Sequence, residues 1–147
     1  VGSEMCKETA YALRDLVTGK KPAQATSFSV TWERDALCFD IRCEEPDMAN
    51  LVVSSEVYEG DSVALLLETP EHSYYQIEIN PDGKIFDADR STGKADAKWD
   101  SLAEVKAHRE SDHWRLEVRI PVAGADDGRS TVFIPVVALY ASETALK

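Results

Sequence analysis

The chain has 147 residues, of which 44% are apolar, and its 16 basic and 27 acidic side chains give a net charge of −11. This length can bury a core without metal or disulfide staples, so we expect residues 1–147 to form one domain. The acidic balance argues against nucleic acid and against an anionic membrane as partners, because both attract basic surfaces. No apolar run approaches the ~20 residues that span a bilayer, and the first residues lack a signal-peptide core. Any secretion signal is therefore expected outside this stretch.

The first expected element is a short helix over residues 4–17. Its apolar residues roughly follow helical spacing, Ser3 can cap its start, and Gly19 can end it. After the break at residues 20–22 (KKP), the apolar period changes from about 3.6 to about 2, which is the signature of strands. The rest of the chain is therefore expected to be almost entirely β.

Short strands follow at regular spacing from there onward. They are expected at residues 27–32, 37–43, 62–68, 74–80, 84–89, 103–109, 113–120 and 132–140, with a short edge strand at 51–53. Proline should end one strand at Pro121, and Pro135 favours a bulge or a sheet edge. Eight or nine such strands with little helix predict an all-β fold, an antiparallel β-sandwich.

The three cysteines leave their pairing open. Cys38 and Cys43 fall in one expected strand an odd number of positions apart, so their side chains should point to opposite sheet faces. About 16 Å of strand separates them, which is too far for a bridge. Cys6 can pair with either one, or all three can be small buried apolar side chains. No spacing of cysteine and histidine matches a zinc site.

Four segments resemble successive blocks of family 9-like carbohydrate-binding modules. They are DALCFDIRCEEP (35–46), VYEGDSVALLLE (57–68), YYQIEINPDGKIFD (74–87) and HWRLEVRIPV (113–122), in the family's order. The resemblance implies a sandwich of jelly-roll type, structural calcium (Ca2+) and attachment to an extracellular glycan-degrading enzyme. We therefore expect a non-catalytic module, part of a larger extracellular or periplasmic protein, with a glycan or oligosaccharide as its ligand.

The sugar-contacting residues that the resemblance implies are only partly present. Family members that bind sugar hold a terminal sugar between two Trp rings, and the first ring falls at Tyr58. The family's sugar-binding glutamate falls at Ala64 and its basic residue at Glu78, so two of the implied hydrogen-bonding groups are replaced. Nothing after Trp114 offers the second tryptophan.

Two aromatic residues are the candidate sugar-binding residues. Tyr58 stands in a polar stretch, where an exposed ring can stack on a pyranose; alternatively, its ring covers the sandwich and its hydroxyl reaches water. Trp99 lies in the polar loop 90–101, either as a second stacking ring or as an anchor that packs on the core, which is the commoner use of Trp. Facing one another at one end of the sandwich, the two rings would rebuild the clamp.

Two carboxylates are the candidate calcium ligands. Glu45 precedes a proline where the family also has a carboxylate, and Asp61 begins the best-matched segment. Calcium takes about 6–8 oxygen ligands, and bound here it would fasten the loop at 44–47 to a strand start. The alternative is that these carboxylates are solvated charges of an acidic protein.

Enzymatic activity is not expected from this chain. Its histidines stand in no metalloprotease motif, and no nucleophile elbow or phosphate loop occurs. A pair of carboxylates for glycoside cleavage stays open, because their spacing is spatial. A haem-binding sandwich would need axial ligands such as Met48 and His113, which have no supporting pattern. The rival to a glycan-binding module is a sandwich that packs on a neighbouring enzymatic domain of the same polypeptide and binds no sugar.

Overall fold

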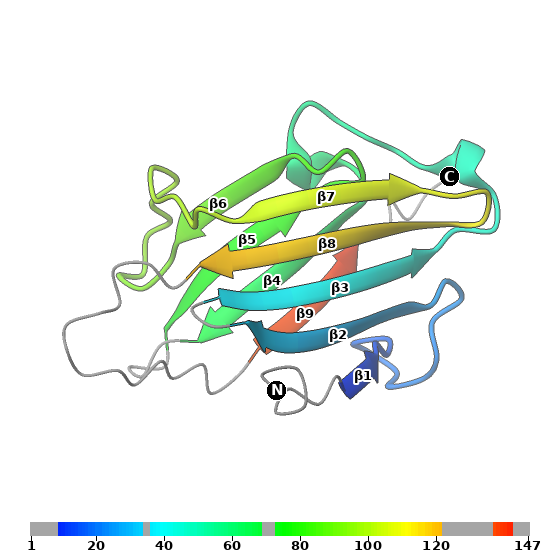
Figure 1. Ribbon diagram of the computed structural model, residues 1–147, viewed down its shortest axis with the longest axis horizontal. Helices are drawn as coiled ribbons and strands as arrows, with labels where there is room; N and C mark the ends of the chain where they lie inside the picture. The colour runs from blue at the N-terminus through cyan, green and yellow to red at the C-terminus, as the bar shows by residue number, and fades with distance from the viewer. Residues whose placement is uncertain (1–8, 34–35, 69–72, 122–136, 143–147) are drawn as a thin grey trace.

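The computed structural model describes residues 9–33, 36–68, 73–121 and 137–142, which form two antiparallel sheets packed face to face (Figure 1). The five-stranded sheet has the order β1-β2-β3-β8-β7, with the bounds Thr9–Ala12, Thr26–Glu33, Ala36–Glu44, His113–Pro121 and Glu104–Arg109. The four-stranded sheet has the order β6-β5-β4-β9, with the bounds Ile85–Asp89, Tyr74–Ile79, Ser62–Glu68 and Val137–Ser142. Two single 3-10 turns, η2 (Met48–Asn50) and η3 (Val57–Glu59), precede β4.

The core lies between the sheets and follows from the alternation of side chains along each strand. In β3 and β8, the two central strands of the larger sheet, every second side chain is buried and the residues between them are polar or partly exposed. The buried cluster consists of Leu37, Phe39, Ile41, Cys43, Val63, Leu65, Leu67, Ile77, Ile79, Trp114, Leu116, Val118 and Ile120. Removing this apolar surface from water is what holds the two sheets together.

Most of the predicted strands are confirmed. Strands β2 to β8 lie where period-2 patterns predict them, and β8 ends at Pro121 as expected. Strand β9 covers the last part of the strand predicted at 132–140. The first part of that segment, including Pro135, lies outside the described residues.

The predicted N-terminal helix (4–17) is wrong over its described part, and its first residues lie outside the described chain. Strand β1 forms instead and pairs with β2, where Tyr11 stacks on Phe28 with 5.2 Å between ring centroids. Leu16 and Val17, which the helix would have buried, are 80% and 92% exposed. Ring packing on the open edge of β2 therefore outweighs a weak helical period.

The short edge strand predicted at 51–53 is also wrong. The segment is held by one residue rather than by a ladder, because the Val52 N–H donates to Asp61 Oδ2 (2.7 Å) and the Asp61 N–H donates to the Val52 carbonyl (2.8 Å). A Cβ at Gly60 would lie 2.6 Å from that carbonyl oxygen, so the close approach requires glycine. These contacts fix the chain that leads from η3 into β4.

The two described cysteines occupy opposite faces of β3, as predicted. Cys43 belongs to the core cluster, whereas Cys38 is half-buried on the outer face, where burial raises the pKa of its thiol. Cys6 lies outside the described residues. Within the described part of the chain, no helix has the length and apolar character needed to cross a membrane.

Candidate functional site

The outer surface of β4, β5 and β6, together with the neighbouring turn η3, carries the main candidate site. Strand register places Ala64 opposite Glu78, and Glu78 opposite Phe86. The next outward row is Leu66, Gln76 and Ala88. We call this surface, with Tyr58 from η3, the aromatic face.

Tyr58 is the exposed ring of the aromatic face. Its side chain is 53% exposed, and its ring contacts that of Phe86 in a T-shaped arrangement, with centroids 5.6 Å apart and planes at 75°. The preceding residue, Val57, is buried and anchors η3 to the sandwich. The negative charge of Glu56, with a smaller contribution from Glu59, raises the pKa of the Tyr58 hydroxyl. The ring is therefore held by one aromatic contact while about half of its surface stays open to a ligand.

A chain of polar side chains runs across the aromatic face. The Ser62 hydroxyl donates to Glu78 Oε1 (2.7 Å), and the Gln76 amide donates to Glu78 Oε2 (2.9 Å). Arg90 Nε in turn donates to Gln76 Oε1 (2.5 Å). Because each member fixes the next, these groups are oriented before any ligand arrives.

Strand pairing brings other polar groups close to Ala64 and Glu78, the two positions that depart from the family pattern. Ala64 lacks the implied carboxylate, but its direct cross-strand partner Glu78 brings one to the same part of the sheet. Glu78 likewise replaces the implied basic residue, but Arg90 supplies a guanidinium at the end of the polar chain. Sequence reasoning missed Gln76 and Arg90 because only the strand register shows which outward positions become neighbours.

The second predicted sugar-binding residue, Trp99, lies elsewhere. Its ring stacks on Tyr75 with centroids 4.7 Å apart and planes at 23°, and both rings pack against the core cluster. Asp87 holds the same loop, since its Oδ2 accepts the Ser101 N–H and hydroxyl at 2.8 Å each. The described structure therefore does not bring Trp99 to Tyr58; it places Trp99 as a partly buried anchor.

The two predicted calcium ligands are both buried. Glu45 accepts the Gln24 amide (3.0 Å) and the Asp47 N–H (3.2 Å), and Asp61 accepts the Val52 N–H. Their carboxylate oxygens suit a hard cation. Neither belongs to the cluster of three potential ligand side chains found among the described residues.

That cluster consists of Glu44, Asp112 and His113, whose ligand atoms lie within 4.8 Å of one another. Arg42 Nε already pairs with Glu44 at 2.6 Å, and His113 Nδ1 lies 2.7 Å from Asp112. Met48, considered from the sequence together with His113 as a haem ligand, packs against the core from η2. The ion pairs already engage all three side chains of the cluster with protein groups.

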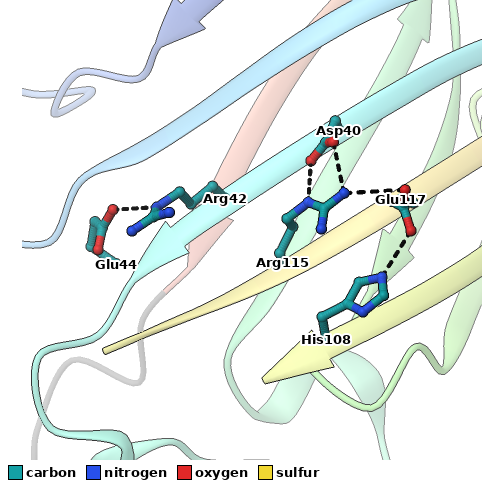
Figure 2. Close-up of polar contacts among 6 residues, drawn as sticks. All are labelled: Asp40, Arg42, Glu44, His108, Arg115 and Glu117. Atoms are coloured by element: carbon teal, nitrogen blue, oxygen red, sulfur yellow. Dashed lines mark hydrogen bonds and ion pairs between the residues drawn. The ribbon is translucent and has the colours of Figure 1, made fainter. Parts of the chain in front are cut away.

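The outer surface of the other sheet is crowded with charges; we call it the charged face. Arg115 from β8 forms two bonds with Asp40 from β3 (2.8 and 3.1 Å) and contacts Glu117 at 3.1 Å (Figure 2). His108 from β7 completes the row at 2.8 Å from Glu117 and lowers the pKa of that carboxylate. Asp40 and Glu117 of this row also line a groove of about 660 Å³, whose other lining residues come from β2, β3, β7 and β8.

Two solved structures share this architecture. Both are described as a carbohydrate binding module family 9 (CBM9) from Caldicellulosiruptor kristjanssonii, one in complex with cellotriose and one in complex with glucose. The first has a TM-score of 0.57 and 15% identity over 95% of this chain and 67% of that chain. The second has a TM-score of 0.53 and 15% identity over 92% of this chain and 65% of that chain.

The present chain thus spans about two thirds of the length of either structure. No protein-family model and no curated sequence matches it. The resemblance inferred from the four sequence segments is confirmed at the level of fold. This chain has the fold of the family 9 carbohydrate-binding modules, an antiparallel β-sandwich.

Proposed function

We propose that this protein is a non-catalytic carbohydrate-binding module that holds a glycan or oligosaccharide on the aromatic face. The observation that carries the proposal is the exposed ring of Tyr58 beside a preorganised row of polar groups centred on Glu78. A flat aromatic ring suits the C–H face of a pyranose, and fixed polar groups suit its hydroxyls. The structures of similar fold were solved with cellotriose and with glucose, which makes these sugars the first ligands to test.

Calorimetric titration with glucose and cellotriose, followed by a glycan array, tests this proposal. We expect saturable binding of at least one oligosaccharide. Failure of every plant, algal and host glycan to bind at millimolar concentration would contradict it. The expected role is to target or support an attached glycan-active enzyme outside the cytoplasm. Cell fractionation of the full-length protein checks the location, and recovery of all of it in the cytoplasm would contradict that role.

The proposal retains structural calcium, with Glu45 and Asp61 as the residues that would hold it. Both carboxylates are buried at the junctions of loops with β3 and β4, where a cation would neutralise their charge. A metal that binds only the folded state raises stability by mass action. We expect a higher melting temperature in millimolar calcium than in excess EDTA. Identical melting curves would remove calcium from the proposal.

The charged face supports a second candidate, a sandwich that packs on an enzymatic domain of the same polypeptide. Its groove contains carboxylates such as Glu104 and cations such as Lys106, a mixture that a polar domain interface can match. If this candidate is correct, the full-length protein should protect amides of β7 and β8 from hydrogen exchange, whereas the module alone should not. Equal protection in both proteins would exclude this packing.

A further inference from the structure

Glu78 is a buried carboxylate whose hydrogen-bond partners are all neutral. It is only 8% exposed, and its two oxygens accept from the Ser62 hydroxyl and the Gln76 amide. Among the described residues, no lysine, arginine or histidine nitrogen forms an ion pair with it within 4.0 Å. A charge removed from water and bonded only by neutral groups is incompletely compensated. An ion pair between a cationic ligand and this carboxylate would therefore yield more binding free energy than an ion pair with an exposed carboxylate.

Two cations on or next to this face, Arg90 and Lys84, both donate to neutral oxygens. Arg90 Nε donates to Gln76 Oε1, one side chain removed from the carboxylate. Lys84 Nζ donates to the main-chain carbonyl of Ser55 in the segment before η3. Neither cation pairs directly with Glu78, so its charge is met by neutral donors alone.

The surroundings of Tyr58, like those of Glu78, favour a positively charged ligand over a negatively charged one. Glu56 and Glu59 flank the ring in sequence, and their charges already disfavour a second anion, the ionised Tyr58 hydroxyl. The ring face itself attracts cations through its quadrupole. The whole chain carries a net charge of −11, which draws cationic ligands toward it and repels anionic ones.

We infer that the aromatic face selects glycans that carry protonated amino groups, such as oligomers of glucosamine, over neutral glycans and over uronic-acid glycans. This inference rests on the proposed function and specifies its ligand class. The pyranose ring lies on Tyr58 and its ammonium group pairs with Glu78. Binding is purely non-covalent.

The test compares three oligomers of equal length by calorimetry below the pKa of the sugar amine: glucosamine, N-acetylglucosamine and glucose. The wild-type protein should bind the glucosamine oligomer about tenfold more tightly than either neutral oligomer, which corresponds to about 1.4 kcal/mol. In Glu78→Gln, which keeps the size and shape of the side chain, the ratio of affinities should fall close to one. Thermal melting of this variant verifies that it folds.

A matched variant separates local pairing from general attraction to an acidic protein. Glu104→Gln removes the same charge from an exposed site on β7, on the charged face, and should keep the wild-type ratio. Added salt should reduce the ratio less than it would for exposed charges, because Glu78 is buried. Raising the pH above the pKa of the sugar amine should abolish the preference.

Each outcome has a distinct meaning. Binding of neutral oligomers without preference for the glucosamine oligomer would overturn this inference and leave the proposed function standing. A preference that survives in Glu78→Gln, or that falls equally in Glu104→Gln, would overturn the assignment to Glu78. Failure of all three oligomers and of the wider glycan array would overturn the proposed function, and this inference with it.

Discussion

The two outer faces of the sandwich differ in how their polar groups are partnered. On the charged face, the carboxylates of Asp40 and Glu117 share the Arg115 guanidinium in a row that spans two strands (Figure 2). On the aromatic face, the buried carboxylate of Glu78 meets only neutral donors, next to the exposed ring of Tyr58. Both faces rest on the same core, one on each sheet.

This difference indicates which face binds a ligand. A ligand on the charged face would have to displace water from side chains that already have charged partners, so little is gained. A ligand on the aromatic face covers an exposed apolar ring and meets polar groups fixed in place by their neighbours. Variants that damage one face and spare the other test this contrast.

The largest expected effect comes from a residue that should matter to neither face. Trp99→Ala removes a ring that stacks on Tyr75 and packs on the core, so it should lower the free energy of unfolding by about 3 kcal/mol, at the low end for Trp-to-Ala changes. Glycan affinity should stay unchanged below the melting temperature. Urea unfolding and calorimetry measure the two quantities. Lost affinity with intact stability would make Trp99 a binding ring after all.

Tyr58→Ala should give the opposite result. Truncating an exposed aromatic residue of a binding site costs on the order of 1–3 kcal/mol of binding free energy. Glycan affinity should therefore fall by roughly five- to a hundredfold. The melting temperature should barely change, because the ring is 53% exposed. Tyr58→Phe keeps the ring and should keep most of the affinity. A large loss of stability without loss of binding would show that the ring is architectural.

Arg115→Ala breaks the central ion pairs of the charged face. Because these side chains are 36% to 43% exposed, the loss of stability should be about 1 kcal/mol or less. Glycan affinity should remain within about twofold of the wild type. Urea unfolding and titration of the same sample check both numbers. A tenfold loss of affinity would indicate that the ligand binds the charged face and would contradict its assignment to the aromatic face.

The smallest effect concerns pH. Burial is the main cause of a pKa for Asp87 that lies above its ordinary value of 3.8, and Oδ1 is buried without a hydrogen-bond partner. The folded state therefore holds this proton more tightly than the unfolded state, so its stabilising contribution is complete below about pH 3.8 and is lost as the pH rises through the folded pKa.

The side chain of the Asp87→Asn variant cannot titrate. The stability of this variant relative to the wild type should therefore increase as the pH rises from about 3.8 through the folded-state pKa of Asp87. Groups whose pKa is lowered, such as Asp112 and Glu117, act equally in both proteins and cancel from the difference in stability. Melting temperatures of both proteins measured from acidic to neutral pH provide the test. A difference that is constant or that shrinks with pH would contradict it.

The sequence predicted most of the fold because the central strands are specified by local alternation. In β8, Trp114 and Leu116 alternate with Arg115 and Glu117, a pattern that few other structures satisfy. The N-terminal segment was predicted wrongly because its weak helical period competes with a distant contact, the stacking of Tyr11 on Phe28. Local pattern cannot reveal such a partner.

The candidate site was predictable only in its local part. Tyr58 stood out as an aromatic residue in a polar stretch and is exposed in the structure. The pairing of Ala64 with Glu78 joins different strands, and the link from Gln76 to Arg90 joins β5 to the end of β6. These neighbours depend on strand register, which emerges only when the sheet is assembled.

The most direct test of the account is to map the binding surface by NMR during titration with an oligosaccharide that binds. Backbone amide shifts should change along β4, β5 and β6 and around η3, centred on Tyr58 and Glu78, while amides of β2, β3, β7 and β8 stay in place. Shifts centred instead on the charged face, around Asp40 and Glu117, would contradict the assignment of the ligand to the aromatic face.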